Sequence, residues 1–501
     1  MSLTQLSTRA QEGINAPEVN VEVHISNGLP AFTMVGLPEA AVREARDRVR
    51  SAIINSGFEF PARRITVNLA PADLPKEGGR YDLAIALGIL AASSQINAST
   101  LDQFDCYGEL ALSGECRPIA GLLPALISSK QQHKKVIIPH QNEPEASLIE
   151  GLTIFTSQSL AQICASLNGG HPLPQLEALD ARYTPHFEYD LDEVYGQYQA
   201  RRALEIAASG AHHMIMMGPP GTGKSMLAQR LNTILPLMSE AEAMSSASIR
   251  SISHKPVNAD NWLQRPFQSP HHTVSGVALV GGGSNPKPGE ISLAHNGVLF
   301  LDELTEFDRK SIEVLREPLE TGKIHISRAA RQAEFPAQFQ LVAAMNPCPR
   351  GCDSIVSCDC SAEQLSRYRN KLSAPLMDRI DIQIELPRLQ SHELLNRKQV
   401  KQEASDVVRT RVTQTRVKQL QRQNCLNSRL TNHQIDDFCQ LDETSEKILM
   451  TAIDKLKLTA RSYHKLLKLA RTIADMAGEK NIQKMHLLEA ISYRQQDKRP
   501  I

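Results

Sequence analysis

The chain reads Gly218-Pro219-Pro220-Gly221-Thr222-Gly223-Lys224-Ser225 near its middle, which matches the phosphate-loop pattern G-x-x-x-x-G-K-[ST]. An apolar run at 214–217 precedes it, and a helical pattern begins at Met226. The glycines allow successive backbone N–H groups to face phosphate oxygens, and the helix N-terminus adds partial positive charge. Lys224 can reach the β- and γ-phosphates, and the Ser225 hydroxyl can bind Mg²⁺. The flanking patterns favour a nucleoside triphosphate site, with ATP and Mg²⁺ as ligands, over a chance glycine-rich turn.

Two further apolar runs end in polar residues. Residues 298–301 lead into Asp302 and Glu303, the Walker B pattern, and residues 340–345 lead into Asn346. Asp302 would hold Mg²⁺, and Glu303 would orient and deprotonate the attacking water. Because parallel strands present their carboxyl ends along one edge of a sheet, we expect these side chains to meet the phosphate loop there. The second carboxylate favours hydrolysis over binding alone, with a surface acidic pair as the alternative.

The composition limits the classes of protein that fit. At 501 residues the chain is long enough for roughly three domains, and 41% of it is hydrophobic. It has no uncharged apolar run of about 18 residues, and residues 1–10 lack the apolar core of a signal peptide, so we expect a cytoplasmic protein. Lysine plus arginine equals aspartate plus glutamate at 55 each, so any nucleic-acid site must be a local patch or channel.

The pattern of predicted elements divides the chain into four parts. In residues 1–168 strand patterns alternate with helices, and residues 169–185 form a linker that begins with Gly and Pro. Residues 186–387 contain the phosphate loop, and residues 388–501 are helix-rich. Ten Lys or Arg face three Asp or Glu in residues 388–429, which fits either a solvated helical face or a nucleic-acid contact.

Four of the nine cysteines lie close together in the chain: Cys348, Cys352, Cys358 and Cys360. They could supply four thiolates to one structural zinc ion. Their spacing, C-x₃-C-x₅-C-x-C, is not the common C-x₂-C pair, so a redox cluster and unmetallated thiols remain as alternatives. A metal beside Asn346 would brace that loop, and no open position for catalysis is implied.

Two insertions surround the predicted ATPase core. The first, between Lys224 and Asp302, is longer than one crossover helix requires, and we expect a flexible insert in which His271 and His272 have local partners. After Asp302 we expect one helix over 308–320. It is followed by an alternating hairpin arm over 323–331, where three cations, Lys323, Arg328 and Arg331, would place positive charge. Such a hairpin could grip the phosphate backbone of a threaded strand, and an exposed basic hairpin is the alternative.

Several motifs resemble the YifB/ComM family of magnesium-chelatase-like AAA+ proteins: Asn346-Pro347-Cys348, 364–373, Met377-Asp378-Arg379-Ile380-Asp381, 281–295 and Ala460-Arg461-Ser462-Tyr463. The resemblance covers essentially the whole chain. It implies an α/β protein with an N-terminal Lon-protease-like domain of the ribosomal S5 domain 2 type. A central AAA+ domain with helix-2 and pre-sensor-1 insertions and a C-terminal helical lid would follow. The cysteines depart from the pattern, since relatives often have the second one at the position of Arg350.

The resemblance also implies roles for single residues and for the assembly. Asn346 would be the sensor 1 residue, Arg379 an arginine finger and Arg461 the sensor 2 residue on the lid. The implied function is an ATP-driven ring, most simply a hexamer, that carries DNA through its pore and promotes branch migration during natural transformation. Alternatives are a magnesium-chelatase motor subunit and the regulator of a protein partner, such as a protease.

The Lon-like segment lacks the residues of Ser–Lys peptidase chemistry. Aligning 75–78 with the Lon pattern puts Arg80 at the serine, and aligning 118–122 puts Leu123 at the lysine. Neither residue can act as nucleophile or base. We therefore expect a scaffold without peptidase activity.

Overall fold

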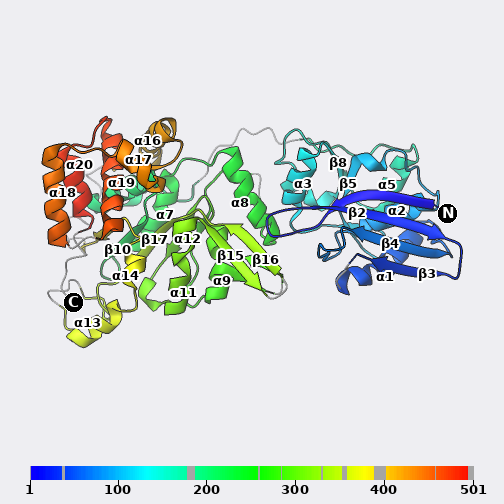
Figure 1. The fold of residues 1–501 in the computed structure, drawn as a ribbon, viewed down its shortest axis with the longest axis horizontal. Coiled ribbons are helices and arrows are strands. Elements are labelled where there is room, and N and C mark those ends of the chain that lie inside the picture. Colours follow the sequence, from blue (N-terminus) through cyan, green and yellow to red (C-terminus); the bar gives the residue numbers. More distant parts are fainter. Residues whose placement is uncertain are drawn as a thin grey trace. The chain divides into compact units, whose positions relative to one another are not determined.

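A computed structural model describes residues 2–36, 40–177, 187–257, 260–283, 285–328, 331–352, 358–388, 402–456 and 459–494 (Figure 1). The chain divides into two compact units. The first comprises residues 1–184, 247–262 and 331–335, and the second comprises residues 185–246, 263–330 and 336–501. Among the described residues, no helix has the length and apolar character needed to cross a membrane.

The first unit is built on a mixed seven-stranded sheet. Its strands, in spatial order, are β3 (Ala31–Val35), β4 (Arg64–Ala70), β2 (Glu18–Ser26), β1 (Ser2–Arg9), β5 (Phe104–Cys106), β8 (Lys135–Pro139) and β9 (Ile154–Ser157). β2 pairs antiparallel with β1 and β4, whereas β5, β8 and β9 run parallel to one another. Alternate residues of β2 are buried, which confirms the strand expected from the period-two pattern.

Helices cover this sheet: α1 (Ala40–Asn55), α2 (Asp82–Ala92), α3 (Leu122–Gln131), α4 (Glu143–Ala146) and α5 (Leu160–Leu167). Every residue of α2 is buried, as its apolar sequence requires. The helix approaches β2 so closely that a Cβ at Gly88 would lie 2.6 Å from Val23 Cγ2. A larger side chain at position 88 would therefore separate α2 from the sheet.

The second unit contains a five-stranded parallel sheet in the order β11 (Phe267–Gln268), β14 (Val298–Leu301), β17 (Gln340–Met345), β10 (Met214–Met217) and β18 (Ile382–Glu385). Apart from Gln340 at the start of β17, its three central strands consist of apolar residues, as expected for a parallel sheet that is buried on both faces. Since all five strands are parallel, the residues that follow β10, β14 and β17 lie at one edge.

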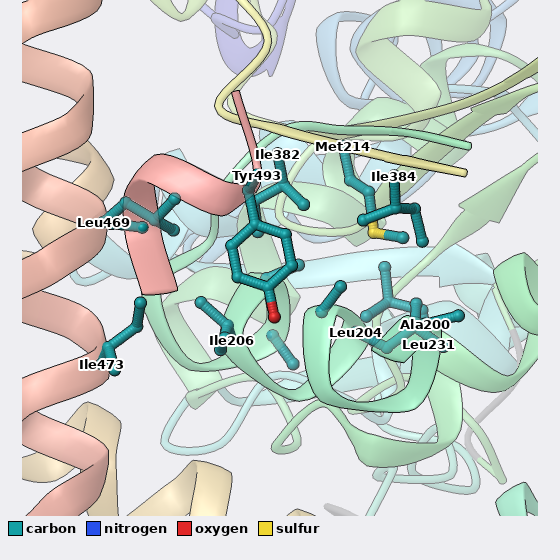
Figure 2. Close-up of a cluster of buried hydrophobic side chains, with 14 of the residues drawn as sticks. Ala200, Leu204, Ile206, Met214, Leu231, Ile382, Ile384, Leu469, Ile473 and Tyr493 are labelled. Carbon is teal, nitrogen blue, oxygen red and sulfur yellow. The ribbon is translucent and has the colours of Figure 1, made fainter. Parts of the chain in front are cut away.

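Helices α6 (Tyr198–Gly210) and α7 (Lys224–Ile234) pack on this sheet together with the C-terminal helices. The latter are α16 (Ser405–Gln423), α17 (Asn432–Phe438), α18 (Glu443–Leu456), α19 (Ala460–Ala477) and α20 (Lys484–Ser492). Figure 2 shows the ring of Tyr493 among side chains from α6, β18 and α19. The helical region and the sheet therefore share one apolar core, whose burial stabilises both.

The helix expected over 308–320 is replaced by three short turns, so that prediction was wrong. They are α11 (Arg309–Glu313), a 3₁₀ turn (Val314–Arg316) and α12 (Pro318–Thr321). Pro318 has no N–H to donate to the preceding turn, so it begins a new helix instead of continuing the old one. Gly322, with φ 68°, ends α12 in the left-handed conformation.

The two insertions contain regular structure. The first holds α8 (Glu240–Ile252), α9 (Gly276–Val280) and the ladder of β12 (Gly281–Gly282) with β13 (Lys287–Pro288), and its strand β11 belongs to the central sheet. The expectation of a merely flexible insert was therefore wrong. The second forms the expected hairpin, with β15 (Lys323–Arg328) paired to β16 (Arg331–Pro336). Arg331 lies in the returning strand, not in the first arm.

Candidate nucleotide-binding site

The phosphate loop joins the end of β10 to the first residue of α7. Gly221 and Gly223 have φ values of 80° and 86°, and a Cβ built on either would meet no atom within 4 Å. Their side of the loop therefore opens into space that phosphate groups can fill. Gly218 has the opposite constraint, because a Cβ there would lie 2.6 Å from the carbonyl oxygen of Leu386.

The Lys224 ammonium turns back onto its own loop. Its Nζ donates to the carbonyl oxygens of Gly218 at 2.7 Å and Pro219 at 2.9 Å, and to Asn346 Oδ1 at 3.2 Å. Burial lowers the pKa of Lys224, while the charges of Asp302 and Glu303 oppose that shift. The lysine predicted from the phosphate loop and the asparagine predicted from the third strand are thus in direct contact.

Ser225 and Asp302 form the second contact across the site. The Ser225 hydroxyl donates to Asp302 Oδ2, and the other carboxylate oxygen accepts the N–H of Glu303 at 2.9 Å. A hydroxyl and a carboxylate are oxygen ligands of the kind that Mg²⁺ prefers. The residues expected to hold Mg²⁺ therefore lie side by side.

Glu303 contacts a residue whose role the sequence did not reveal. Its Oε2 lies 3.2 Å from Nδ1 of His272, and Glu303 itself has the left-handed φ of 51°. The His272 ring packs on His271, with centroids 4.1 Å apart, and on Phe307. A local partner was expected for both histidines, but His272 instead reaches a glutamate 31 positions away in the chain. The parallel pairing of β11 with β14 brings the two together.

Asn346 is held from the backbone side as well. Its carbonyl oxygen accepts the Tyr368 hydroxyl at 3.1 Å, and that hydroxyl in turn accepts from Thr305 Oγ1 at 2.7 Å. Tyr368 belongs to α13 (Ala362–Arg369), and Thr305 follows the Walker B residues. This hydrogen-bonded chain connects the ends of β14 and β17 without passing through the phosphate loop.

Arg379 and Arg461 share a partner, Glu320, and within the described residues neither is bonded to the phosphate loop. Arg379 Nη2 lies 2.8 Å from one carboxylate oxygen of Glu320, and Arg461 Nη2 contacts the other. Arg379 Nη1 also donates to the carbonyl oxygen of Pro375 at 2.6 Å. Glu320, which joins the two arginines, was not singled out from the sequence because an acidic residue on a short helix carries no distinguishing pattern.

The four cysteines converge. The sulfur atoms of Cys348, Cys352, Cys358 and Cys360 all lie within 4.8 Å of one another. Backbone N–H groups of Cys352 and Cys360 donate to the sulfurs of Cys348 at 3.2 Å and Cys358 at 3.4 Å. Four sulfur donors in one cluster suit zinc. The same loop touches the phosphate loop, since a Cβ at Gly351 would lie 2.8 Å from Pro220 Cδ.

Only part of the expected cationic surface can be placed. Lys323 begins β15 and is exposed. Arg328 and Arg331 belong to β15 and β16, and their side chains lie outside the described residues.

Within the described part of the basic run, residues 402–429, several arginines bond to other parts of the second unit. Arg411 pairs with Glu205 and Glu403, and Arg422 pairs with Asp475. The buried Arg416 donates to the carbonyl oxygen of Ala208. These contacts attach α16 to neighbouring helices, so these arginines serve packing more than either expected surface role.

In the first unit, Arg80 and Leu123 are both buried. The Arg80 guanidinium donates to the carbonyl oxygen of Ala120 at 2.5 Å. Arg80 therefore hydrogen-bonds within the unit, and Leu123 packs in its interior.

The sheet order, the phosphate loop and the paired carboxylates define a mixed α/β protein of AAA+ architecture with a C-terminal helical region. Three family descriptions match the chain: "Magnesium chelatase, subunit ChlI" at residues 190–394, "Subunit ChlI of Mg-chelatase" at 21–142, and "Magnesium chelatase, subunit ChlI C-terminal" at 402–494.

Relatives that match almost the whole chain identify its family more specifically. YifB of Escherichia coli and competence protein ComM of Haemophilus influenzae are each 49% identical to this chain over 498 residues, which is 99% of this chain and 98% of each relative. The magnesium-chelatase 38 kDa subunit of Cereibacter sphaeroides is 25% identical over 178 residues, covering 32% of this chain and 53% of its own length. The chain belongs to the YifB/ComM family of magnesium-chelatase-like proteins.

Proposed function

We propose that this chain is a cytoplasmic ATP-hydrolysing motor that assembles as a ring, most simply a hexamer, and acts on DNA. The observation that carries the proposal is the meeting of Lys224, Ser225, Asp302 and Asn346 at the carboxyl edge of one parallel sheet. A binding-only protein would not need Glu303 beside this group.

The side chains would act in a defined sequence. Bound ATP and Mg²⁺ supply the phosphoanhydride bond and the divalent charge, and Ser225 and Asp302 would hold the metal. The Lys224 ammonium would exchange the carbonyl oxygens of Gly218 and Pro219 for phosphate oxygens. Glu303, once separated from His272, would accept the proton of the attacking water on its carboxylate, and Asn346 would orient that water.

Other residues of the chain would mediate subunit assembly and DNA binding. Arg379 and Arg461 would complete the nucleotide site of a neighbouring subunit. The basic hairpin with Lys323, Arg328 and Arg331 would contact the phosphate backbone of DNA in the pore, without base readout. We also propose residues 1–168 as a Lon-like scaffold, 169–185 as a linker, 186–387 as the AAA+ core and 388–501 as the lid.

The DNA assignment is supported by the name of the Haemophilus relative, competence protein ComM, which connects that protein with competence. We propose branch migration during recombination of transforming DNA as the reaction. ATP turnover measured alone and with single-stranded, duplex or branched DNA tests the proposal. DNA should raise the ATP turnover rate of the wild type. Glu303→Gln should hydrolyse no ATP, either with or without DNA. A turnover rate that no DNA changes would count against a DNA motor.

A magnesium-chelatase motor subunit is a second candidate, favoured by the matching family descriptions and the Cereibacter relative. The extent of the similarity argues against it, because YifB and ComM match 99% of this chain whereas the Cereibacter chelatase subunit matches 32%. Stimulation of ATP turnover by a chelatase partner, together with no response to DNA, would favour this candidate over the DNA motor.

The converging sulfurs support a further proposal, a structural zinc ion held by Cys348, Cys352, Cys358 and Cys360. With four thiolate ligands the metal would have no open coordination position, so its role would be structural. It would hold in place the loop that follows Asn346 and approaches Pro220. Zinc analysis of the purified chain, before and after chelation, tests the assignment.

A further inference from the structure

Glu320 lies between the two arginines that a neighbouring nucleotide would use. Its carboxylate is 2.8 Å from Arg379 through one oxygen and contacts Arg461 through the other. The three residues come from distant parts of the chain: α12, the turn after α14 (Ala374–Met377) and the first turn of α19. One carboxylate thus holds two guanidinium groups together, and the cluster of three retains one net positive charge.

The arginines are anchored so that they move together. Lys465, one turn after Arg461 on α19, donates to the carbonyl oxygen of Arg379 and pairs with Asp381 at 2.8 Å. The backbone of Arg379 is therefore tied to the helix that carries Arg461. A displacement of α19 would carry both guanidinium groups without separating them.

The contacts of Glu320 are suited to exchange. The side chains of Glu320 and Arg461 are 41% and 46% exposed, whereas Arg379 is only 8% exposed. Exposed ion pairs contribute little stability, so their replacement by another anion has a low energetic cost. The buried Nε of Arg379 has no hydrogen-bond partner within the described residues, so its bonding capacity is incompletely used.

We propose that Glu320 is an internal competitor for the triphosphate of a second copy of this chain. Its carboxylate keeps Arg379 and Arg461 paired until that triphosphate, with more negative charge and three terminal oxygens, replaces it. The inference rests on the proposed ATPase function. Glu320 would then control how readily subunits assemble, because its contacts with Arg379 and Arg461 must break before a subunit interface can form.

The alternative is that Glu320 only fastens the lid to the core. The two roles predict opposite effects of Glu320→Gln, whose neutral amide holds guanidinium groups weakly. An internal competitor would hinder assembly, so its removal would promote assembly. A fastener would stabilise the fold, so its removal would lower thermal stability and activity together.

The test is the protein concentration at which ATP turnover per subunit reaches half its maximum, measured on the full chain. Glu320→Gln should lower that concentration by at least about 5-fold, the factor that corresponds to the loss of the exposed contact with Arg461 alone. Glu317→Gln is the matched control, because Glu317 is an exposed glutamate three positions upstream. It should match the wild type, and thermal melting should be alike for all three proteins.

An unchanged half-maximal concentration, an equal shift in Glu317→Gln, or reduced turnover of Glu320→Gln at every concentration would overturn the inference. Mass measurements with a non-hydrolysable ATP analogue provide a readout independent of turnover. If the wild type hydrolysed no ATP, the proposed function would fail. Assembly of Glu320→Gln with the analogue at a lower protein concentration than the wild type would still support the role of Glu320. Assembly of both proteins at the same concentration would overturn that role.

Discussion

Lys224 Nζ and Asn346 Oδ1 lie 3.2 Å apart, so a hydrogen bond joins the phosphate loop to the end of β17. The same ammonium also donates to two carbonyl oxygens of its own loop. A bound triphosphate would offer charged acceptors in their place, and charge-assisted hydrogen bonds are stronger than neutral ones. The contact therefore connects nucleotide binding with the strand that positions Asn346.

Lys224→Ala should weaken nucleotide binding by about 10- to 100-fold, since hydrogen bonds to charged groups each contribute about 1.5–3 kcal/mol. Titration of a fluorescent ATP analogue measures the effect. Lys484→Ala, which removes an exposed lysine on α20, is the control and should bind as the wild type does. Equal affinity of Lys224→Ala and the control would contradict the assignment of the loop.

Glu303→Gln should retain ATP binding and lose turnover by about 10²- to 10⁴-fold, because the amide cannot accept the proton of the water. Binding and single-turnover hydrolysis, measured on the same preparation, separate the two effects. A variant that hydrolysed ATP at the wild-type rate would remove Glu303 from the reaction.

His272→Ala should change kcat more than KM, because His272 acts on Glu303 and not on the nucleotide. His433→Ala, which changes an exposed histidine of α17, is the control. Steady-state ATP turnover over a range of ATP concentrations compares the two variants. Equal kcat values for His272→Ala and His433→Ala would show that the contact with Glu303 has no part in the reaction.

Cys360→Ser should abolish a zinc content of about one ion per chain, because one oxygen replaces one of four thiolates. It should also weaken ATP binding through the contact between Gly351 and Pro220. Elemental analysis and nucleotide titration give the two readouts, with Cys425→Ser as the control outside the cluster. A chain that contained no zinc even in its wild-type form would contradict the metal proposal.

Stability should depend on pH through two buried histidines that accept hydrogen bonds from the backbone near the start of β17. Nδ1 of His295 accepts the N–H of Gln338, and Nδ1 of His213 accepts the N–H of Leu341, both at 3.0 Å. Burial lowers the pKa of each from 6.5 to about 4, because the charged imidazolium loses its hydration inside the protein. Below pH 6.5 the unfolded chain therefore binds more protons than the folded chain.

The free energy of unfolding should consequently fall between pH 6.5 and pH 4, by up to about 1.4 kcal/mol per pH unit and histidine. Urea unfolding at several pH values measures the slope. His295→Asn should reduce it, whereas His433→Asn, which changes an exposed residue of α17, should not. A slope unaffected by His295→Asn would remove this histidine from the explanation.

The apolar runs predicted the strands that end at the site, because a parallel sheet buried on both faces requires them. The phosphate loop and the two carboxylates follow from local sequence patterns, the G-x-x-x-x-G-K-[ST] motif and the apolar strand that precedes Asp302 and Glu303. Glu320 and His272 could not be predicted in the same way. Their partners lie far away in the chain, and only the folded sheet and the C-terminal helices bring them together.

The break at Pro318 shows a different limit. The residues around it have a helical pattern, but the proline begins a new turn and places Glu320 on the short helix α12. A helix that continued unbroken would have directed this carboxylate elsewhere. The local break therefore contributes to the contact with Arg379 and Arg461.

The central claim is that the chain converts ATP hydrolysis into movement on DNA. A labelled four-stranded DNA junction, incubated with the full chain, ATP and Mg²⁺, tests it most directly, with Glu303→Gln in parallel. The wild type should convert the junction into products in an ATP-dependent manner, and Glu303→Gln should bind the junction without converting it. Identical behaviour of the two proteins, with the junction left unchanged by both, would contradict the claim.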